Sequence, residues 1–254
     1  MNAAGPRPRV TVVTGSAGGI GHALVARFRE GGDHVIGVDV AEAPDDDTGR
    51  PDTTVEADVS TAEGWEAVVH TVEKVGSGLA TLVNCAGIGG RTDLLGTSLA
   101  DWDRVLGVNL TGTWLGMKTC HHLLADRAAY EGDAAIVNFG SIYGQLPPPV
   151  EGNTPSSPAY QASKAGILAL TKTAASEWAA DGIRVNAVAP GLFRTHLTES
   201  LSEEAYAARM RPIAMRRDGD TRELADVVWF LAGPESSYVT GTTVNVDGGF
   251  PLWL

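Results

Sequence analysis

Short apolar runs rich in β-branched residues alternate with longer amphipathic segments along almost the whole chain, and this alternation limits the possible folds more than any other feature. Seven runs are predicted strands, at residues 9–15, 34–40, 53–60, 80–87, 133–141, 183–191 and 242–249. The predicted helices cover residues 20–32, 61–76, 101–128, 157–180 and 220–231. Several strand runs are almost continuously apolar, as expected when helices cover both faces of a sheet. The order predicts an α/β fold with right-handed crossovers and seven mainly parallel strands.

Length, charge and cysteine content narrow the class of protein. The 254 residues show neither an internal repeat nor a long linker, so we predict one domain, residues 1–254. The net charge of −12 argues against nucleic acid and against an anionic membrane surface as partners. Cys85 and Cys120 form no CxxC pair, and no metal-ligand spacing is present. With no signal-peptide core or membrane-spanning apolar run, we expect a reduced cytoplasmic protein without a metal.

The segment VVTGSAGGIGHAL joins the first predicted strand to the first predicted helix. It places Gly15, Gly19 and Gly21 in a Gly-x-x-x-Gly-x-Gly spacing. A strand that turns sharply into a helix brings backbone N–H groups to the helix N-terminus, where they can bind a diphosphate. Side chains at the glycine positions would obstruct that approach. The segment therefore predicts a dinucleotide-binding loop, which includes Ile20.

An acidic residue ends the second predicted strand. Asp39 lies 18 residues after Gly21, close to the roughly 20-residue interval expected for a carboxylate that binds the adenosine ribose. A carboxylate accepts hydrogen bonds from a diol and repels a 2′-phosphate. Gly18 and Val40, where a cation would favour that phosphate, are uncharged. We therefore predict NAD rather than NADP as the cofactor.

The sequence YQASK places Tyr160 and Lys164 four residues apart, on one face of a predicted helix. A free phenol has a pKa of about 10. A nearby cation favours the phenolate and lowers that pKa. The pair therefore predicts a general acid or base beside its activator. Two unrelated helix residues are the alternative reading of the spacing taken alone.

Further motifs follow one another in order along the chain. They are TGSAGGIG (14–21), DV (58–59), NCAG (84–87), VNLTG (108–112), GS (140–141), YQASK (160–164), RVNAVAPG (184–191) and VTGTTVNVDGG (239–249). Together with Asp39 they resemble the classical type of the short-chain dehydrogenase/reductase family. The resemblance implies a single-domain, Rossmann-like, doubly wound sheet. It also implies an oxidoreductase that transfers a hydride between NAD(H) and a small secondary alcohol or ketone.

The resemblance implies a role for each matching residue. Tyr160 would be the proton donor or acceptor, Lys164 would lower its pKa and hold the nicotinamide ribose, and Ser141 would hydrogen-bond the substrate oxygen. Asn109 would position a water that connects Lys164 to solvent. The remaining implied cofactor contacts are Asp58 and Val59 at the adenine, Asn84, Ala86 and Gly87 after the fourth strand, and Pro190, Gly191, Phe193 and Thr195 at the nicotinamide.

Three features depart from the family pattern. Cys85 stands where Asn is common, and Phe193 stands where Ile or Val is usual, which could change the shape of the pocket. Ser141 precedes Tyr160 by 19 residues, more than family members usually show. The extra residues fall in the Pro-rich segment 144–158. We expect that segment to bulge at the substrate entrance while a strand and a helix hold Ser141 beside Tyr160.

Substrate and assembly are less constrained by the sequence. The amphipathic segment 192–216 is predicted to form a substrate lid. Arg91, Arg194 and His196 are candidates to face an anionic substrate, although solvent-facing positions are favoured for each. The resemblance implies a homotetramer, or a dimer, formed through the two long helices and the last strand.

Two other functions stay open. One is an NADPH-dependent reductase of ketones or 3-oxoacyl thioesters, which the carboxylate of Asp39 disfavours. The other is an NAD-binding regulator without turnover. The complete set of Asn109, Ser141, Tyr160 and Lys164 argues against a regulator, because a sensor needs no acid and no activator.

Overall fold

The computed structural model describes residues 8–42, 48–76, 78–90, 92–132, 134–148, 157–194 and 202–251. The strands are β1 (Val10–Thr14), β2 (His34–Asp39), β3 (Thr53–Glu56), β4 (Thr81–Asn84), β5 (Ala134–Phe139), β6 (Ile183–Pro190) and β7 (Thr243–Val246). The α-helices are α1 (Gly19–Glu30), α2 (Ala62–Val75), α3 (Leu99–Leu106), α4 (Gly112–Glu131), α5 (Pro158–Trp178), α7 (Glu203–Met210) and α8 (Thr221–Ala232). A π-helical turn, η1 (Gly107–Thr111), and the 3₁₀ turns η2 (Ile142–Gly144), η4 (Ala179–Asp181) and η5 (Pro234–Ser236) complete the described elements.

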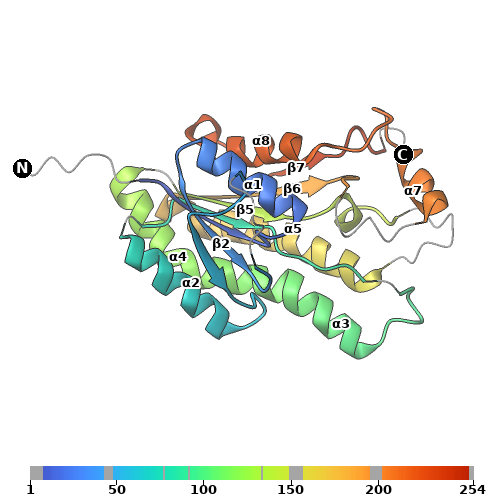
Figure 1. The fold of residues 1–254 in the computed structure, drawn as a ribbon, viewed down its shortest axis with the longest axis horizontal. Helices are drawn as coiled ribbons and strands as arrows, with labels where there is room; N and C mark the ends of the chain where they lie inside the picture. The colour runs from blue at the N-terminus through green and yellow to red at the C-terminus, as the bar shows by residue number, and fades with distance from the viewer. Residues whose placement is uncertain are drawn as a thin grey trace, which may run out of the picture.

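The strands form one sheet in the order β3-β2-β1-β4-β5-β6-β7. Every neighbouring pair in it is parallel. The strand order reverses its direction between β1 and β4, the place where open α/β sheets bind ligands at the carboxyl ends of their strands. The α/β fold predicted from the sequence is therefore confirmed (Figure 1).

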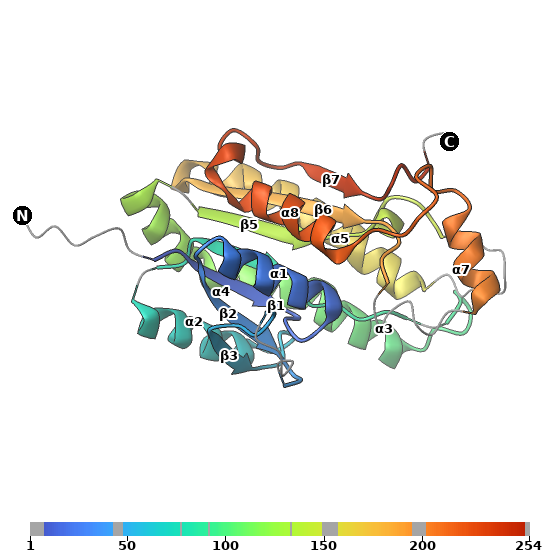
Figure 2. The same cartoon turned by 45° about the horizontal axis from the view of Figure 1, so that its top comes forward.

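Apolar clusters cover both faces of the sheet, because successive strand residues point to opposite sides. Val12 belongs to the cluster that packs against α2, α4 and α5. Val13, the next residue, belongs to the cluster that packs against α1 and α8. Figure 1 and Figure 2 show α1 and α8 on one side of the sheet, with α2 and α4 on the other. This two-sided burial explains the almost continuously apolar strands.

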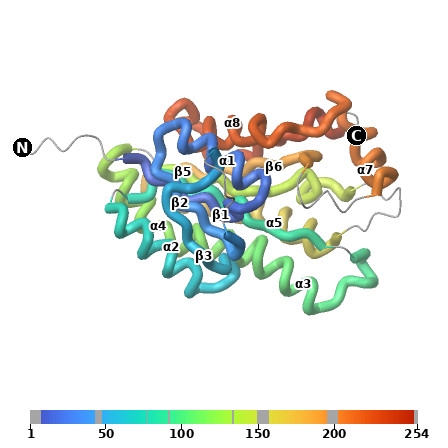
Figure 3. The backbone as a smooth tube through the Cα atoms, viewed as in Figure 1, coloured from blue at the N-terminus to red at the C-terminus, as the bar shows by residue number. Residues whose placement is uncertain are grey.

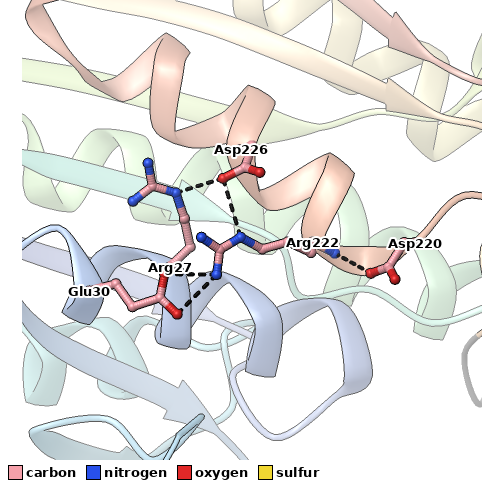
Figure 4. Close-up of polar contacts among 5 residues, drawn as sticks. All are labelled: Arg27, Glu30, Asp220, Arg222 and Asp226. Carbon is pink, nitrogen blue, oxygen red and sulfur yellow. Dashed lines mark hydrogen bonds and ion pairs between the residues drawn. The ribbon is translucent and has the colours of Figure 1, made fainter.

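Helices α1 and α8 are joined by the charged contacts that Figure 4 shows and by a contact with an aromatic ring. Asp226 accepts a hydrogen bond of 2.7 Å from Arg27 and lies 3.3 Å from Arg222. Arg222 also pairs with Glu30 at 2.7 Å. The guanidinium of Arg27 lies 4.5 Å from the ring centroid of Trp229. These contacts connect the first crossover helix to the last, far apart in the sequence.

The predicted helix at residues 101–128 is not continuous. The structure divides it into α3, the π turn Gly107–Thr111 and α4. Such a turn carries one residue more than a regular helical turn, and π turns of this kind are frequent at functional sites. The helical spacing of apolar residues in the sequence gives no sign of a boundary here, so the sequence pattern did not predict the π turn.

The other predicted boundaries hold within a few residues. Thr61 caps α2 by accepting a hydrogen bond from the N–H of Gly64. The predicted lid, 192–216, contains α7, while residues 195–201 and most of the Pro-rich segment lie outside the described residues. Figure 2 and Figure 3 show α7 at the end of the molecule toward which the strands run. Among the helices described, none is long and apolar enough to cross a membrane.

Candidate active site

The three predicted loop glycines meet different surroundings. Gly15 has a φ of +69°, and a Cβ there would lie 2.8 Å from the Cα of Ala86. A Cβ at Gly21 would overlap the carbonyl oxygen of Gly15. A Cβ at Gly19 would meet nothing within 4 Å. Gly15 and Gly21 are therefore required by the fold of the turn itself, whereas the open side of Gly19 leaves room for a ligand against the backbone.

The first turn of α1 lacks a side-chain cap. Its N-cap residue is Gly18, and no side chain accepts a hydrogen bond from the helix N-terminus. Helices α2, α3, α7 and α8 are each capped by a Ser, Thr or Asp side chain. The uncapped N–H groups of α1 are suited to an anion such as a diphosphate. Ile20 packs half-buried against the apolar cluster under α1.

Asp39 lies beside this loop, as predicted. Its carboxylate accepts hydrogen bonds from the N–H of Ala17 at 3.0 Å and of Ala41 at 3.1 Å. The carboxylate thereby ties the glycine loop to the end of β2. The bonds also fix where any ligand of Asp39 would have to lie.

The predicted adenine residues follow β3. The carboxylate of Asp58 accepts a hydrogen bond of 2.8 Å from the N–H of Ser60, and the carbonyl of Val59 accepts one of 2.9 Å from the indole of Trp65. Both side-chain and backbone contacts thus fix the short loop between β3 and α2. Asp58 is exposed at this loop, and Val59 is nearly buried.

The residues after β4 approach the predicted catalytic group. The hydroxyl of Thr14 accepts hydrogen bonds from the N–H groups of Cys85 and Ala86, both at 3.0 Å. A Cβ at Gly87 would lie 3.3 Å from Asn109 Oδ1 and 3.4 Å from Lys164 Nζ. Gly87 therefore borders the predicted catalytic residues directly. Cys85 is small enough to fit here, and its thiol is free.

Asn84 is turned into the sheet. Its side chain is 3% exposed and donates a hydrogen bond of 2.9 Å to the side-chain oxygen of Asn138 on β5. Asn138 in turn donates to the hydroxyl of Thr171 on α5 at 3.0 Å. The Asn84 side chain therefore links β4 to β5 and, through Asn138, to α5, while its Oδ1 is buried without a hydrogen-bond partner.

Asn109 lies in the π turn and is completely buried. Its side-chain oxygen accepts a hydrogen bond from the N–H of Ile88 at 2.8 Å, and its nitrogen donates to the carbonyl of Ile88 at 3.0 Å. The same nitrogen donates to the hydroxyl of Ser163 at 3.0 Å. Asn109 thus clamps the loop after β4 to α5, one residue before Lys164.

Lys164 and Tyr160 face each other on α5. The Nζ of Lys164 donates a hydrogen bond of 2.7 Å to the carbonyl of Phe139 and lies 5.7 Å from the ring centroid of Tyr160. Burial lowers the pKa of Lys164 from 10.5 to about 8. The ammonium is therefore still mostly charged at neutral pH, and it loses its proton unusually easily.

The sequence predicted a lowered pKa for the Tyr160 phenol, and the direction of that prediction is wrong. Burial raises the pKa of the Tyr160 phenol, and a hydrogen bond with the Ser141 side chain is the largest effect that opposes this rise. The free-energy cost of desolvating the phenolate exceeds the stabilisation that nearby groups give to it. Tyr160 is consequently a protonated phenol at neutral pH, ready to donate.

Ser141 reaches Tyr160 because η2 packs on α5. Its hydroxyl oxygen accepts a hydrogen bond from the N–H of Tyr143 at 3.1 Å, which starts the η2 turn. A Cβ at Gly144, the end of that turn, would lie 2.8 Å from the carbonyl carbon of Lys164. The structure therefore brings Ser141 to Tyr160 before the long segment begins, as expected. The predicted bulge itself lies outside the described residues.

The predicted nicotinamide segment follows β6. Gly191 donates a backbone hydrogen bond of 2.9 Å to the carbonyl of Val246, and the side chain of Phe193 is 4% exposed within the cluster under α1 and α8. The Phe193 ring therefore packs in the core, and Pro190 is half-buried before it. Thr195 lies outside the described residues.

A cavity of about 190 Å³ opens beside this segment. Its walls include Leu192, Phe193, Asp218, Gly219, Val246 and Asp247. None of the four predicted catalytic residues lines it. The cavity thus borders the segment after β6 and is not the place where a substrate would meet Tyr160.

Of the three cationic candidates for substrate contact, only Arg194 is described. Its Nε pairs with Asp218 at 2.8 Å, and its guanidinium lies over Tyr206, so it is already engaged. Arg91 and His196 lie outside the described residues. Two residues of the site were missed, namely Tyr143 and Arg209, and the charge of Arg209 helps to lower the pKa of both Tyr143 and Tyr160 against the effect of burial. No motif spacing marks Arg209, although Tyr143 follows Ser141 by only two residues.

Comparison with known proteins places this geometry in a family. A family model described as enoyl-(acyl carrier protein) reductase matches residues 15–251. An uncharacterised short-chain type dehydrogenase/reductase of Sinorhizobium fredii is 40% identical over 250 residues. The alignment covers 95% of this chain and 43% of that protein. The chain belongs to the short-chain dehydrogenase/reductase family. As a short-chain dehydrogenase/reductase it is an oxidoreductase, in agreement with the sequence analysis.

Two further similarities cover almost all of this short-chain dehydrogenase/reductase. A 3-oxoacyl-[acyl-carrier-protein] reductase of Thermotoga maritima is 36% identical, with 96% of this chain and 98% of that protein aligned. The crystal structure of a short chain dehydrogenase from Leptospira borgpetersenii with bound NAD⁺ matches with a TM-score of 0.86 and 29% identity. That match covers 96% of this chain and 93% of the other.

Proposed function

We propose that this chain is an NAD-dependent dehydrogenase/reductase that interconverts a secondary alcohol and a ketone, with Tyr160 as proton donor and acceptor. The observation that carries the proposal is the convergence of Ser141, Tyr160 and Lys164 at the carboxyl ends of β4 and β5. Asn109 supports the group from the π turn. Tyr160 and Lys164 come from α5, Asn109 from η1 and Ser141 from the start of η2, and hydrogen bonds fix Asn109, Ser141 and Lys164 directly.

The residues present fit a dinucleotide. The open side of Gly19 and the uncapped N-terminus of α1 provide a cradle for a diphosphate. Asp39 stands beside the same loop, where its oxygens can accept hydrogen bonds from ribose hydroxyls. Val40 is exposed and uncharged, so no cation is offered there to a 2′-phosphate. These features support NAD.

The chain's own residues manage one proton. When bound, the nicotinamide would supply the hydride donor or acceptor. In reduction, the hydroxyls of Ser141 and Tyr160 donate hydrogen bonds to the substrate oxygen as negative charge develops on it. Tyr160 then transfers its proton to that oxygen. In oxidation Tyr160 receives the proton, for which it must first be ionised.

Lys164 makes the ionised form of Tyr160 attainable. Its ammonium faces the phenol, and a positive charge at this distance stabilises the phenolate. Because the pKa of Lys164 is lowered to about 8, it can also pass a proton onward at a slightly alkaline pH. Asn109 keeps the adjoining loop and helix in register. This division of roles makes oxidation more dependent on pH than reduction.

A second candidate is an NADPH-dependent reduction of a 3-oxoacyl thioester. The similarity to the Thermotoga maritima reductase favours it. The two candidates differ in measurable ways, because the first predicts faster turnover with NADH and with small ketones. The second predicts faster turnover with NADPH and with acetoacetyl-CoA.

We also propose that the chain works in the cytoplasm and that it forms a tetramer or dimer. Light scattering of the purified protein can test the oligomeric state.

The test is a screen of secondary alcohols and ketones with each of the two cofactors. The absorbance of the reduced nicotinamide measures turnover. Tyr160→Phe should lower kcat on the preferred compound by roughly 10²–10⁴-fold. Ser141→Ala should lower it as well. Tyr238→Phe, at a fully exposed tyrosine, is the matched control and should leave the rate unchanged. Tight NADH binding without turnover of any compound would instead favour a regulator.

A further inference from the structure

Arg209 stands out among the cations at the strand ends. It lies at the end of α7, and its Nε is buried without a hydrogen-bond partner. Its guanidinium lies 5.6 Å from the ring centroid of Tyr143. Among the described residues it forms no ion pair. A buried guanidinium nitrogen without an acceptor is costly, so such a group calls for an explanation.

Three other arginines in the C-terminal third of the chain form ion pairs. Arg194 pairs with Asp218 at 2.8 Å and Arg217 with Glu223 at 2.6 Å. Arg222 pairs with Glu30. Each of these exposed arginines thus has a carboxylate partner, whereas the described residues offer none to the more buried Arg209.

The surroundings of Arg209 are apolar. Tyr143 packs edge-on against Phe250, with ring centroids 6.1 Å apart. Both belong to a small cluster with Ile142, Leu192 and Ile213. In such surroundings an unpaired cation attracts an anion more strongly than it would in water.

The position of Arg209 relates it to the reacting centre. Tyr143 is hydrogen-bonded through its N–H to Ser141, the predicted ligand of the substrate oxygen. The charge of Arg209 also helps to lower the pKa of both Tyr143 and Tyr160, against the effect of their burial. A substrate held by Ser141 and Tyr160 would therefore extend toward Arg209.

We propose that Arg209 binds a carboxylate of the substrate, so that the chain acts on a hydroxy acid and its oxo acid. The inference rests on the proposed function and names its substrate class. The Nε and one Nη of an arginine form a planar edge that matches the two oxygens of a carboxylate. The unpaired atom is Nε, which belongs to that edge. Closing α7 over the acid would complete the site.

The experiment compares acids with neutral analogues. Straight-chain 2-oxo and 3-oxo carboxylic acids are each assayed with NADH against their own primary amides, for the parent and for Arg209→Gln. We expect kcat/KM for the best acid to fall by roughly 10- to 100-fold in Arg209→Gln, mainly through KM. The loss for its amide should be at least about tenfold smaller. Arg209→Lys should recover part of the loss, because it keeps the charge without the planar edge.

Arg211→Gln is the control for net charge. It removes the same charge just beyond the end of α7, at an exposed residue, and should leave the ratio of acid to amide unchanged. If neutral ketones are turned over through Tyr160 while no acid is preferred, the inference is overturned and the proposed function stands. A preference for phosphorylated hydroxy ketones would overturn the assignment to a carboxylate.

If the protein turns over none of these compounds, a binding measurement still tests the inference. The thermal shift of the NADH-loaded protein is measured with each acid and each amide, for the parent and for Arg209→Gln. A stabilisation by acids that requires Arg209 would support the inference even if the proposed reaction fails. Equal shifts in parent and variant would overturn it.

Discussion

Gly144 lies directly against the backbone of Lys164, so close that a Cβ at Gly144 would stand 2.8 Å from the carbonyl carbon of Lys164. This contact seats the η2 turn on α5 and carries Ser141 to the phenol of Tyr160. We expect Gly144→Ala to destabilise the protein by about 1–3 kcal/mol, since neither backbone can yield easily. It should also lower kcat/KM, because Ser141 moves with the turn. Urea unfolding and steady-state kinetics measure the two effects.

Gly107→Ala is the matched control for Gly144→Ala. A Cβ at Gly107 would meet only Ser60, at 4.0 Å, so both stability and activity should be retained. Equal effects of the two substitutions would show that the close contact of Gly144 is not what positions Ser141.

Gly19 and Gly21 should respond in opposite ways to an added methyl group. Gly21→Ala should lower the Tm strongly, because its Cβ would overlap the Gly15 carbonyl. Gly19→Ala should keep the Tm, or raise it slightly through better helix propensity, and should weaken NADH binding. Calorimetry and NADH fluorescence titration give both quantities. Unchanged NADH affinity in Gly19→Ala would place the diphosphate elsewhere.

Asp39 should decide between the two cofactors. Replacing it by Asn keeps an acceptor for the N–H of Ala17 but removes the charge that repels a 2′-phosphate. We expect the ratio of kcat/KM for NADH to that for NADPH to fall by at least about tenfold, equivalent to roughly 1.4 kcal/mol. Asp103→Asn, at an exposed acid on α3, removes the same net charge and should leave the ratio as it is.

The lowered pKa of Lys164 predicts how stability depends on pH. The folded value of about 8 lies below the ordinary value of 10.5, so between these pH values the unfolded chain binds more protons. The free energy of unfolding should therefore rise with pH in this window, relative to that of Lys164→Met. The gain should be on the order of 3 kcal/mol across the full window. Urea unfolding of both proteins near the two ends of the window tests this, and a pH-independent difference would contradict it.

The junction of α1 and α8 should depend on Trp229 more than on its ion pairs. Asp226→Asn removes contacts between exposed side chains, which contribute little, so its Tm should stay close to that of the parent. Trp229→Ala removes the ring that packs edge-on against Phe28 at 5.3 Å and under Arg27. We expect a loss of about 2 kcal/mol or more. A larger loss in Asp226→Asn would reverse this ranking.

The sequence predicted the sheet and the glycine loop well because both follow from local patterns. Continuous apolar strands and the spacing of Gly15, Gly19 and Gly21 are properties of short segments. Tyr160 and Lys164 were found because their spacing puts them on one helical face, and Ser141 because of the resemblance to the family. The separate roles of the glycines were not predictable, since each depends on backbone from another segment.

The positions of the site residues could be predicted from the sequence, but the combined effect of charge and burial on their pKa values could not. The sequence suggested that Lys164 lowers the pKa of Tyr160, yet burial acts on both groups and raises the pKa of the phenol. Arg209 was missed for a related reason. Its importance comes from having no partner in a buried place, which only the packing of α7 on Tyr143 reveals.

The π turn at Gly107–Thr111 has a consequence for how such a chain can change in length. The turn absorbs its additional residue locally, so each residue of α4 lies about 100° from the position around the axis that an uninterrupted α-helix would give it. A single-residue deletion between Leu106 and Gly112 would close the turn into regular α-helix and leave α3 and α4 packed, but it would remove the geometry that bonds Asn109 to both Ile88 and Ser163. Such a shortened chain should fold and lose activity.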